Sequence, residues 1–419
     1  THEILSHTKM TRFTPSGFAH WFVMIGFVTL FGSLVQAYGE VINPEFKLPI
    51  IGNWIVYRAF VVGIAGLTGG GIIVLIKVRF WNMWFRKGRK NRFLGSVTWR
   101  GLYVELTILA VVICVFILQF SHNASVIRVT AAAKICISMA WFIVIALNLT
   151  MGVAWHRFLA PFNIFFQRNP DKRPSLGAVP EMLSHGKPIN FEDPSEDDVF
   201  GIGKSADISW KGLLDMASCT ECGRCQSQCP AWHTDKPLSP KLLIMAMRDH
   251  ALTKVQSEDK IVGNVISEDV LWSCTTCGAC VNECPVDIEH IDHITNMRRY
   301  QVLVESEFPT ELGNTFKNLE KAGNPWGANR ADRDAWINEV GFPIRKIEGE
   351  IPDDVEYLFW VGCAGAFEER AKKTTKAVAE LLHMAGVSFG VLGKRETCSG
   401  DPARRAGNEF LYQILSAEN

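Results

Sequence analysis

Long uncharged apolar runs dominate the first part of the chain. Residues 17–38 carry no charged side chain, and residues 59–76 form a second such run. Residues 101–120 form a third run with one acidic residue, and residues 135–155 form a fourth without charge. A stretch of about 18 or more apolar residues is long enough to cross a bilayer as an α-helix. The pattern therefore predicts an α-helical membrane bundle of four spans.

Basic residues concentrate in one of the predicted loops. The loop after the second run holds eight Lys or Arg residues up to Arg100 and no acidic residue. Loops on the cytoplasmic side of a membrane carry an excess of Lys and Arg. This bias predicts a multi-pass membrane protein, with Thr1 and everything after Trp155 on the cytoplasmic side.

Two histidines lie at the ends of predicted spans. His20 is in the first turn of the first span, and His156 is at the end of the fourth, both toward the predicted cytoplasmic side. Ionisable residues inside a membrane are costly and usually functional. Two neutral imidazoles could bind one haem from both faces, so we expect one haem b on His20 and His156. Interfacial histidines that contact lipid headgroups are the alternative, and His7 is expected to be solvated.

Glycines reduce the side-chain bulk on one face of the second run. They either make room for a macrocycle or let helices pack closely. These residues are Gly63, Gly66, Gly69, Gly70 and Gly71. Cys114 and Cys136 are expected to be small apolar fillers within the bilayer.

Eight cysteines form two near-identical runs. They read Cys219-x-x-Cys222-x-x-Cys225-x-x-x-Cys229-Pro230 and Cys274-x-x-Cys277-x-x-Cys280-x-x-x-Cys284-Pro285. In this pattern the fourth Cys of each run binds the other run's [4Fe–4S] cluster. The spacing predicts cluster 1 on Cys219, Cys222, Cys225 and Cys284, and cluster 2 on Cys274, Cys277, Cys280 and Cys229. Zinc, the alternative, prefers two Cys pairs set well apart, and disulfides are not expected in the cytoplasm.

The rest of the chain predicts a partial α/β domain. Tyr357 opens a predicted buried strand that leads to Cys363, residues 370–384 are helical, and a second strand leads to Cys398. Strand-end loops are where ligands sit in open α/β sheets. Cys363 and Cys398 are therefore candidate ligands of a third iron–sulfur cluster, with an unliganded buried pair as the alternative.

These patterns give a domain organisation. It consists of residues 1–166 (membrane), 167–210 (acidic linker), 211–305 (α-helical two-cluster ferredoxin), 306–354 (connector) and 355–419 (the N-terminal part of the Cys-rich domain). The 43 basic and 43 acidic residues balance, which argues against a nucleic-acid partner. The 48% hydrophobic content excludes a disordered chain, and the length excludes a small disulfide scaffold.

The membrane part resembles the cytochrome b subunit of respiratory nitrate reductases. The resemblance rests on Gly17-Phe-Ala-His20, Gly26-Phe-Val-Thr-Leu30 and His156-Arg-Phe-Leu-Ala-Pro161-Phe-Asn163. It implies that His20 and His156 bind the haem nearer the cytoplasmic partner. That family's second haem would need histidines within residues 29–34 and near residues 134–138, where this chain has none. Because that family has five spans, we expect a further span before Thr1.

The Cys runs and the segments around Cys363 and Cys398 resemble heterodisulfide reductase and its relatives. The central Cys-Cys pair of that repeat reads Cys398-Ser399 here, and its downstream cysteines are expected beyond Asn419. The order of cytochrome b, ferredoxin and Cys-rich repeat resembles the actinobacterial membrane oxidoreductases that pass electrons from electron-transfer flavoprotein to menaquinone. The resemblance implies a location in the bacterial plasma membrane. The segment from Ser218 to Trp232 carries this resemblance most closely.

The predicted function is an electron-transfer flavoprotein:quinone oxidoreductase. Electrons are expected to pass from the flavoprotein through the Cys-rich site, the two clusters and the haem to menaquinone in the lipid bilayer. No catalytic acid or base is assigned, although His7, Glu105 and Arg157 could handle protons. The alternatives are a quinol-linked disulfide reductase, the electron-transfer subunit of a lactate- or glycolate-type dehydrogenase, and a membrane-tethered redox sensor.

Overall fold

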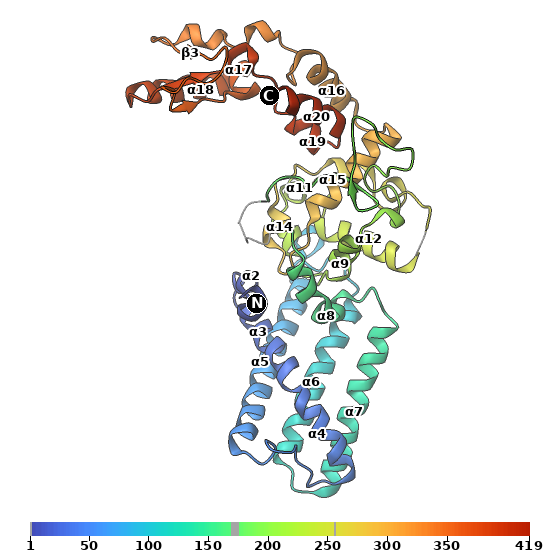
Figure 1. Cartoon of the computed structure of the whole chain (residues 1–419). Coiled ribbons are helices and arrows are strands. Elements are labelled where there is room, and N and C mark those ends of the chain that lie inside the picture. The colour runs from blue at the N-terminus through green and yellow to red at the C-terminus, as the bar shows by residue number, and fades with distance from the viewer. Residues whose placement is uncertain (1, 169–175, 255–256) are drawn as a thin grey trace. The chain divides into compact units, whose positions relative to one another are not determined.

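The chain divides into two compact units (Figure 1). The computed structural model describes residues 2–168, 176–254 and 257–419. The first unit comprises residues 1–177 and 204–291, so it holds both the membrane helices and the two Cys runs. The second comprises residues 178–203 and 292–419. Part of the predicted acidic linker thus belongs to the second unit, where it buries Met182 and Ile189, while residues 169–175 lie outside the described residues.

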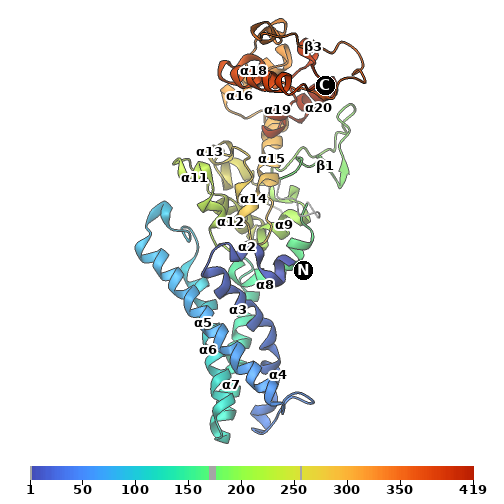
Figure 2. The same cartoon turned by 90° about the vertical axis from the view of Figure 1, so that its left-hand side faces the viewer.

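A group of helices, of which the long ones are apolar, forms the membrane part of the first unit. They are α1 (His2–Ser6), α2 (Thr8–Thr11), α3 (Ser16–Thr29), α4 (Phe31–Ile42), α5 (Ile55–Phe85), α6 (Thr98–Phe120), α7 (Ala124–Ala146) and α8 (Gly152–Phe165). Figures 1 and 2 both show α5, α6 and α7 running alongside one another. Within the described residues, these three helices are long and apolar enough to cross a membrane, and the pair α3 and α4 is a fourth span if it counts as one.

The predicted first span is bent. Helices α3 and α4 meet at Leu30 with an angle of 44° between them. Two hydroxyls bond back to the helix here, because Thr29 Oγ1 donates to the carbonyl of Ile25 and Ser33 Oγ donates to the carbonyl of Leu30. Such back-bonding is known to bend helices.

The predicted fourth span, residues 135–155, was placed wrongly. Helix α7 begins at Ala124, where the Asn123 side chain accepts from two backbone amides, and it ends at Ala146. His156 lies on the separate helix α8. The prediction started after Lys134 because a charge inside a bilayer is costly. The structure tolerates Lys134 within the helix because its ammonium donates to Ser33 of α4.

Helices α3 and α5 pack through glycine. A Cβ on Gly71 would lie 2.5 Å from the carbonyl oxygen of Ala19, one residue before His20. A Cβ on Gly69 would lie 3.2 Å from Val112 of α6, whereas one on Gly70 would meet nothing within 4 Å. Small residues let membrane helices approach closely. Tight helix packing, one of the two predicted roles, therefore explains Gly71.

Short helices frame the Cys runs in the same unit. They are α9 (Trp210–Ala217), α10 (Arg224–Ser227), α11 (Pro230–His233), α12 (Pro240–Thr253), α13 (Glu268–Trp272) and α14 (Ala279–Glu283). Helix α15 (His290–Tyr300) follows and continues into the second unit.

The second unit is an α/β fold. Its elements are the hairpin β1 (Leu183–Ser184) and β2 (Lys187–Pro188), then α16 (Thr310–Ala322), β3 (Arg345–Lys346), β4 (Tyr357–Leu358), α17 (Gly362–Phe367), α18 (Glu369–Met384), β5 (Phe389–Val391), α19 (Asp401–Arg405) and α20 (Glu409–Glu418). The parallel sheet has the order β3-β5-β4. This confirms the predicted β–α–β pattern, with two differences. Strand β3 lies in the predicted connector, and β4 is exposed rather than buried.

We predict that Gly71→Val destabilises the membrane bundle. The added side chain must displace the α3 backbone, and overpacking of this kind costs about 1–3 kcal/mol. Gly70→Val adds the same side chain to the same helix in open space, so it serves as the matched control. Thermal unfolding in detergent measures the difference, and equal unfolding temperatures would contradict the packing role.

Candidate redox centres

The two Cys runs adopt matching backbone turns. Glu221 and Thr276, two residues after the first Cys of each run, have φ of 57° and 55°. Gly223 and Gly278 follow at equivalent positions with φ of 71° and 76°. A left-handed conformation is the reason for glycine there. Each run thus places its third Cys on a short helix, α10 or α14.

The eight thiols form two neighbouring groups. Cys225 interacts electrostatically with Cys222, Cys219 and Cys284. Cys280 interacts in the same way with Cys274, Cys277 and Cys229. This membership is what crossed ligation of two clusters requires. Cys225 also interacts with Cys280, so the groups lie side by side.

These groups do not form a single-ion site. Among the described residues, no three His, Cys, Asp or Glu side chains converge closely enough to hold one metal ion. A four-iron cluster needs its thiolates spread around a cube, whereas zinc needs them around one point. Burial raises the pKa of the Cys219 thiol to about 11, and Arg248 opposes this shift. A bound metal would be needed to hold this thiol deprotonated at neutral pH.

Buried cations surround the first group of thiols. The side chains of Arg224, Lys241 and Arg248 are almost fully buried, and each interacts electrostatically with at least one thiol of this group. Arg248 also pairs with Glu221 at 2.9 Å. Cations at this position stabilise the negative charge that bound thiolates bring.

Two of these cations, Arg224 and Lys241, join the thiol loops to the membrane part. Arg224 donates to the carbonyls of Lys9 and Met10 at 2.9 and 3.0 Å. Lys241 donates to the carbonyls of Arg92 and Leu94 at 3.0 and 2.6 Å. The Arg-rich loop after α5 therefore packs directly against the Cys domain.

Helix α8 begins against the first run. A Cβ on Gly152 would lie 2.0 Å from the carbonyl oxygen of Cys219, so only glycine fits at the start of this helix. His156 follows one turn later on the same helix. The first thiol group is thus the one beside the histidine-bearing helix.

Three histidines gather in the membrane part. The rings of His20 and His156 have centroids 6.0 Å apart. His7 Nε2 lies 3.1 Å from His20 Nδ1, and His156 Nδ1 lies 3.2 Å from the carbonyl of Gly152. His7 is 8% exposed, so the prediction that it is solvated was wrong. The feature of the sequence that could have indicated its burial is its position just before an apolar run.

The histidine geometry fits a haem ligand pair. Metal-binding histidines usually engage one ring nitrogen with a neighbouring group and leave the other for the metal. His20 and His156 each engage Nδ1, which leaves Nε2 available. The assignment of haem b to this pair stays a prediction.

The second unit brings Cys363 and Cys398 together. Their side chains are hydrogen-bonded, which lowers the pKa of Cys398 to about 6 and raises that of Cys363. The Arg333 guanidinium lies 3.5 Å from Cys363 Sγ and lowers the pKa of both thiols. The pair therefore favours one thiolate beside a cation.

An ion pair fixes the turn that carries Cys363. Arg333 and Glu396 are both buried and lie 2.6 Å apart. Glu396 also accepts from the backbone amides of Val361 and Gly362 at 3.2 and 2.7 Å. Sequence reasoning missed this pair, because its partners are 63 residues apart.

Two other charged groups differ from the prediction. Glu105, a candidate for handling protons, is buried and paired with Arg79 at 2.8 Å. Lys134, which was expected to lie at the edge of a span, is buried within the bundle at 1% exposure. A lysine within an otherwise apolar run was the signal that could have identified it.

Comparisons with known proteins identify one 4Fe-4S domain and one Cysteine-rich domain. Residues 215–288 match the 4Fe-4S dicluster domain family. Residues 357–419 match the Cysteine-rich domain family. These matches support iron–sulfur clusters as cofactors and confirm the predicted order of a ferredoxin-like region followed by a Cys-rich domain. No solved structure matches the chain.

The chain is also similar to curated oxidoreductases. It is 31% identical to the EtfAB:quinone oxidoreductase of Syntrophomonas wolfei, over 99% of this chain and 64% of the relative. It is 36% identical to the "Probable iron-sulfur-binding oxidoreductase FadF" of Bacillus subtilis, over 63% of this chain and 42% of the relative. A component of the dihydromethanophenazine:CoB–CoM heterodisulfide reductase of Methanosarcina mazei is 28% identical over 48% of this chain and 50% of the relative. The chain thus spans less than two thirds of each relative, and the comparisons indicate an iron–sulfur oxidoreductase.

We predict that paired Cys→Ser changes reveal the crossed ligation. If Cys222 and Cys284 bind the same cluster, the double variant should lose no more iron than either single variant, about half of that in the two sites. The control pair, Cys277→Ser with Cys284→Ser, should lose both clusters. Iron content and electron paramagnetic resonance after anaerobic reconstitution measure this, and the opposite pattern would show uncrossed ligation.

We predict that Arg333→Met loosens the Cys363 turn. Breaking a buried ion pair costs about 3–5 kcal/mol, because the remaining charge is left unpaired. Hydrogen exchange at residues 361–363 should rise accordingly. Arg345→Met removes the exposed pair with Asp354 and should cost about 1 kcal/mol or less. Equal exchange in the two variants would argue against the role of Glu396.

Proposed function

We propose that this chain belongs to a membrane oxidoreductase that passes electrons from reduced electron-transfer flavoprotein to menaquinone. The observation that carries the proposal is the contact between the backbone of Cys219, the first residue of the first Cys run, and the histidine-bearing helix α8, within one compact unit. The similarity to an EtfAB:quinone oxidoreductase over nearly the whole chain supports the donor and the acceptor class.

The polypeptide positions the carriers. Four thiols of each group would hold one [4Fe–4S] cluster, and the groups are adjacent. His20 and His156 would hold a haem b. When bound, these groups supply one-electron transfer. The residues of the chain set their order and hold cations near the first thiol group.

The contacts also support a cytoplasmic location for the iron–sulfur domain. The Arg-rich loop donates from Arg92 Nε to the carbonyl of Cys222, and Arg89 stacks on the ring of Trp232 at 3.6 Å. Whichever side of the membrane holds this loop also holds the Cys runs. The excess of basic residues favours the cytoplasmic side.

The second unit is the proposed entry point for electrons. Cys363 and Cys398 remain candidate ligands of a third cluster, held beside Arg333. Disulfide reduction with quinol electrons is the second candidate function, because the chain is similar to a component of a heterodisulfide reductase. The single Cys at 398, followed by Ser399, weakens that alternative.

The test is anaerobic and optical. The purified protein in detergent is mixed with reduced electron-transfer flavoprotein, and the absorbance of its metal centres is followed. We expect reduction that a menaquinone analogue then reverses, and we expect Cys284→Ser to slow both phases. If the flavoprotein reduces nothing while a quinol does, the donor is wrong and disulfide reduction becomes the leading function.

A further inference from the structure

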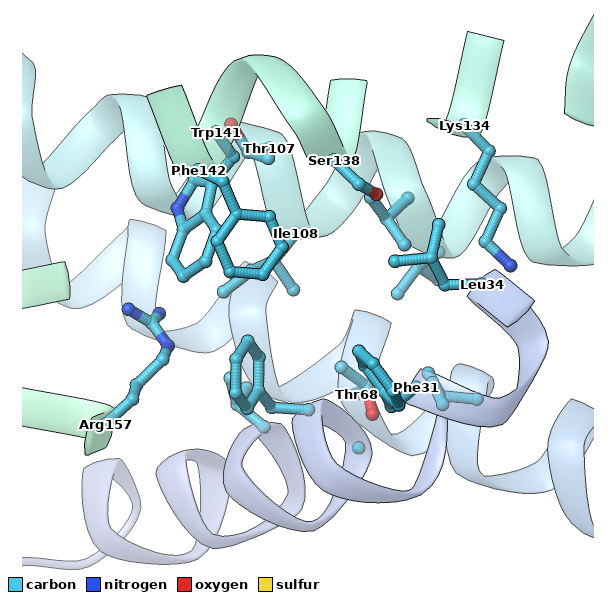
Figure 3. A pocket seen from close by; sticks show the side chains of 16 residues that line it. Phe31, Leu34, Thr68, Thr107, Ile108, Lys134, Ser138, Trp141, Phe142 and Arg157 are labelled. Atoms are coloured by element: carbon cyan, nitrogen blue, oxygen red, sulfur yellow. The ribbon is translucent and has the colours of Figure 1, made fainter. Parts of the chain in front are cut away.

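A cavity lies inside the membrane bundle. It is bounded by α3, α4, α5, α6, α7 and α8 and has an empty volume of about 760 Å³, counting its open mouth. Figure 3 shows Lys134 at one end and Arg157 at the other, with aromatic rings between them. Binding sites for small molecules usually have apolar walls and a few placed polar groups.

Lys134 offers a free donor at its end of the cavity. Two of the three ammonium N–H groups donate to Ser33, to its carbonyl and its Oγ, both at 2.8 Å. Within the described part of the chain, the third has no protein partner. Glu40 of α4, also buried, interacts electrostatically with Lys134, and Lys47 pairs with Glu40 at 3.7 Å.

Arg157 offers donors at the opposite end. One guanidinium nitrogen, Nη1, donates to the carbonyls of Val153 and Ala154. The group lies 5.4 Å from the ring of Phe27 and 5.5 Å from that of Trp141. In the described residues its remaining N–H groups have no hydrogen-bond acceptor, so they are available to a ligand.

The bend between α3 and α4 shapes the cavity. Leu30, Phe31 and Leu34 line it from one side of the bend, and Ser138 lines it from α7. No histidine is among the lining residues that the structure describes. A haem would therefore lack an axial ligand there, whereas the donors Lys134 and Arg157 suit a ligand with a hydrogen-bond acceptor at each end.

We infer that this cavity binds the ring of a quinone. A 1,4-quinone carries two carbonyl oxygens on opposite sides of a flat apolar ring. Lys134 donates to one oxygen, Arg157 faces the other, and Phe27, Phe31 and Trp141 pack on the ring. The inference rests on the proposed function and names its acceptor site.

The reduction of the quinone balances with the electron donor already proposed. Reduction of a quinone to its quinol takes up two electrons and two protons, with one proton added to each oxygen. The reduced flavoprotein would supply the two electrons, through the metal centres that the Cys residues and His20 and His156 would hold. Water supplies the protons.

The test is binding of a short-chain naphthoquinone to the oxidised protein, which needs no turnover. Lys134→Met should weaken binding about tenfold, because a hydrogen bond from a charged donor is lost. Ser138→Phe should abolish it by filling the cavity. Arg128→Met and Cys136→Phe make the same changes at exposed positions on α7 and should leave the affinity within about twofold.

A photoreactive naphthoquinone gives a readout that depends on no variant. Labelling of the wild-type protein should map to residues 23–34 and 134–142. If quinone binds the wild type but all four variants bind it equally, or if the label maps elsewhere, this site is wrong and the proposed function stands. If the wild type neither binds quinone nor is oxidised by it after chemical reduction, the proposed function fails as well.

Discussion

The first unit depends on the hydrogen bonds and charge interactions of its buried cations. Arg224 and Lys241 donate hydrogen bonds to backbone carbonyls of the membrane part, and both interact electrostatically with the first thiol group. A buried charge is expensive unless its hydrogen bonds are satisfied. The membrane loops therefore cannot move away from the Cys domain without leaving these cations unpaired, and the two form one compact unit.

The placement of these cations also favours one direction of electron transfer. They surround the thiol group beside α8, whereas Arg89 is the basic residue that interacts with Cys229 of the other group. Positive charge favours the more negative, reduced state of a nearby centre. If each thiol group holds a cluster, the cations would stabilise an electron on the cluster beside the histidines, in agreement with the proposed flow toward the membrane.

The sequence predicted features that depend on neighbours in the chain. The Cys runs and the apolar helices could be identified because their spacing and length carry the signal. Features that depend on distant partners could not. Lys134 lies inside α7 because Ser33, 101 residues away, accepts from it. His7 is buried because it contacts His20, and Cys363 is held by Glu396; neither partner is adjacent in sequence.

The charge of Lys134 is better explained by a ligand than by stability. A hydrophobic side chain of similar volume at a buried ionic position is often neutral or stabilising by about 1–4 kcal/mol. Ser33 and Glu40 compensate the cost of the ammonium but do not require it. Polar residues within a membrane that face the bundle interior usually mark a functional pathway. The cavity beside Lys134 supplies the place for such a ligand, so the bend at Leu30, the buried lysine and the aromatic walls have one common explanation.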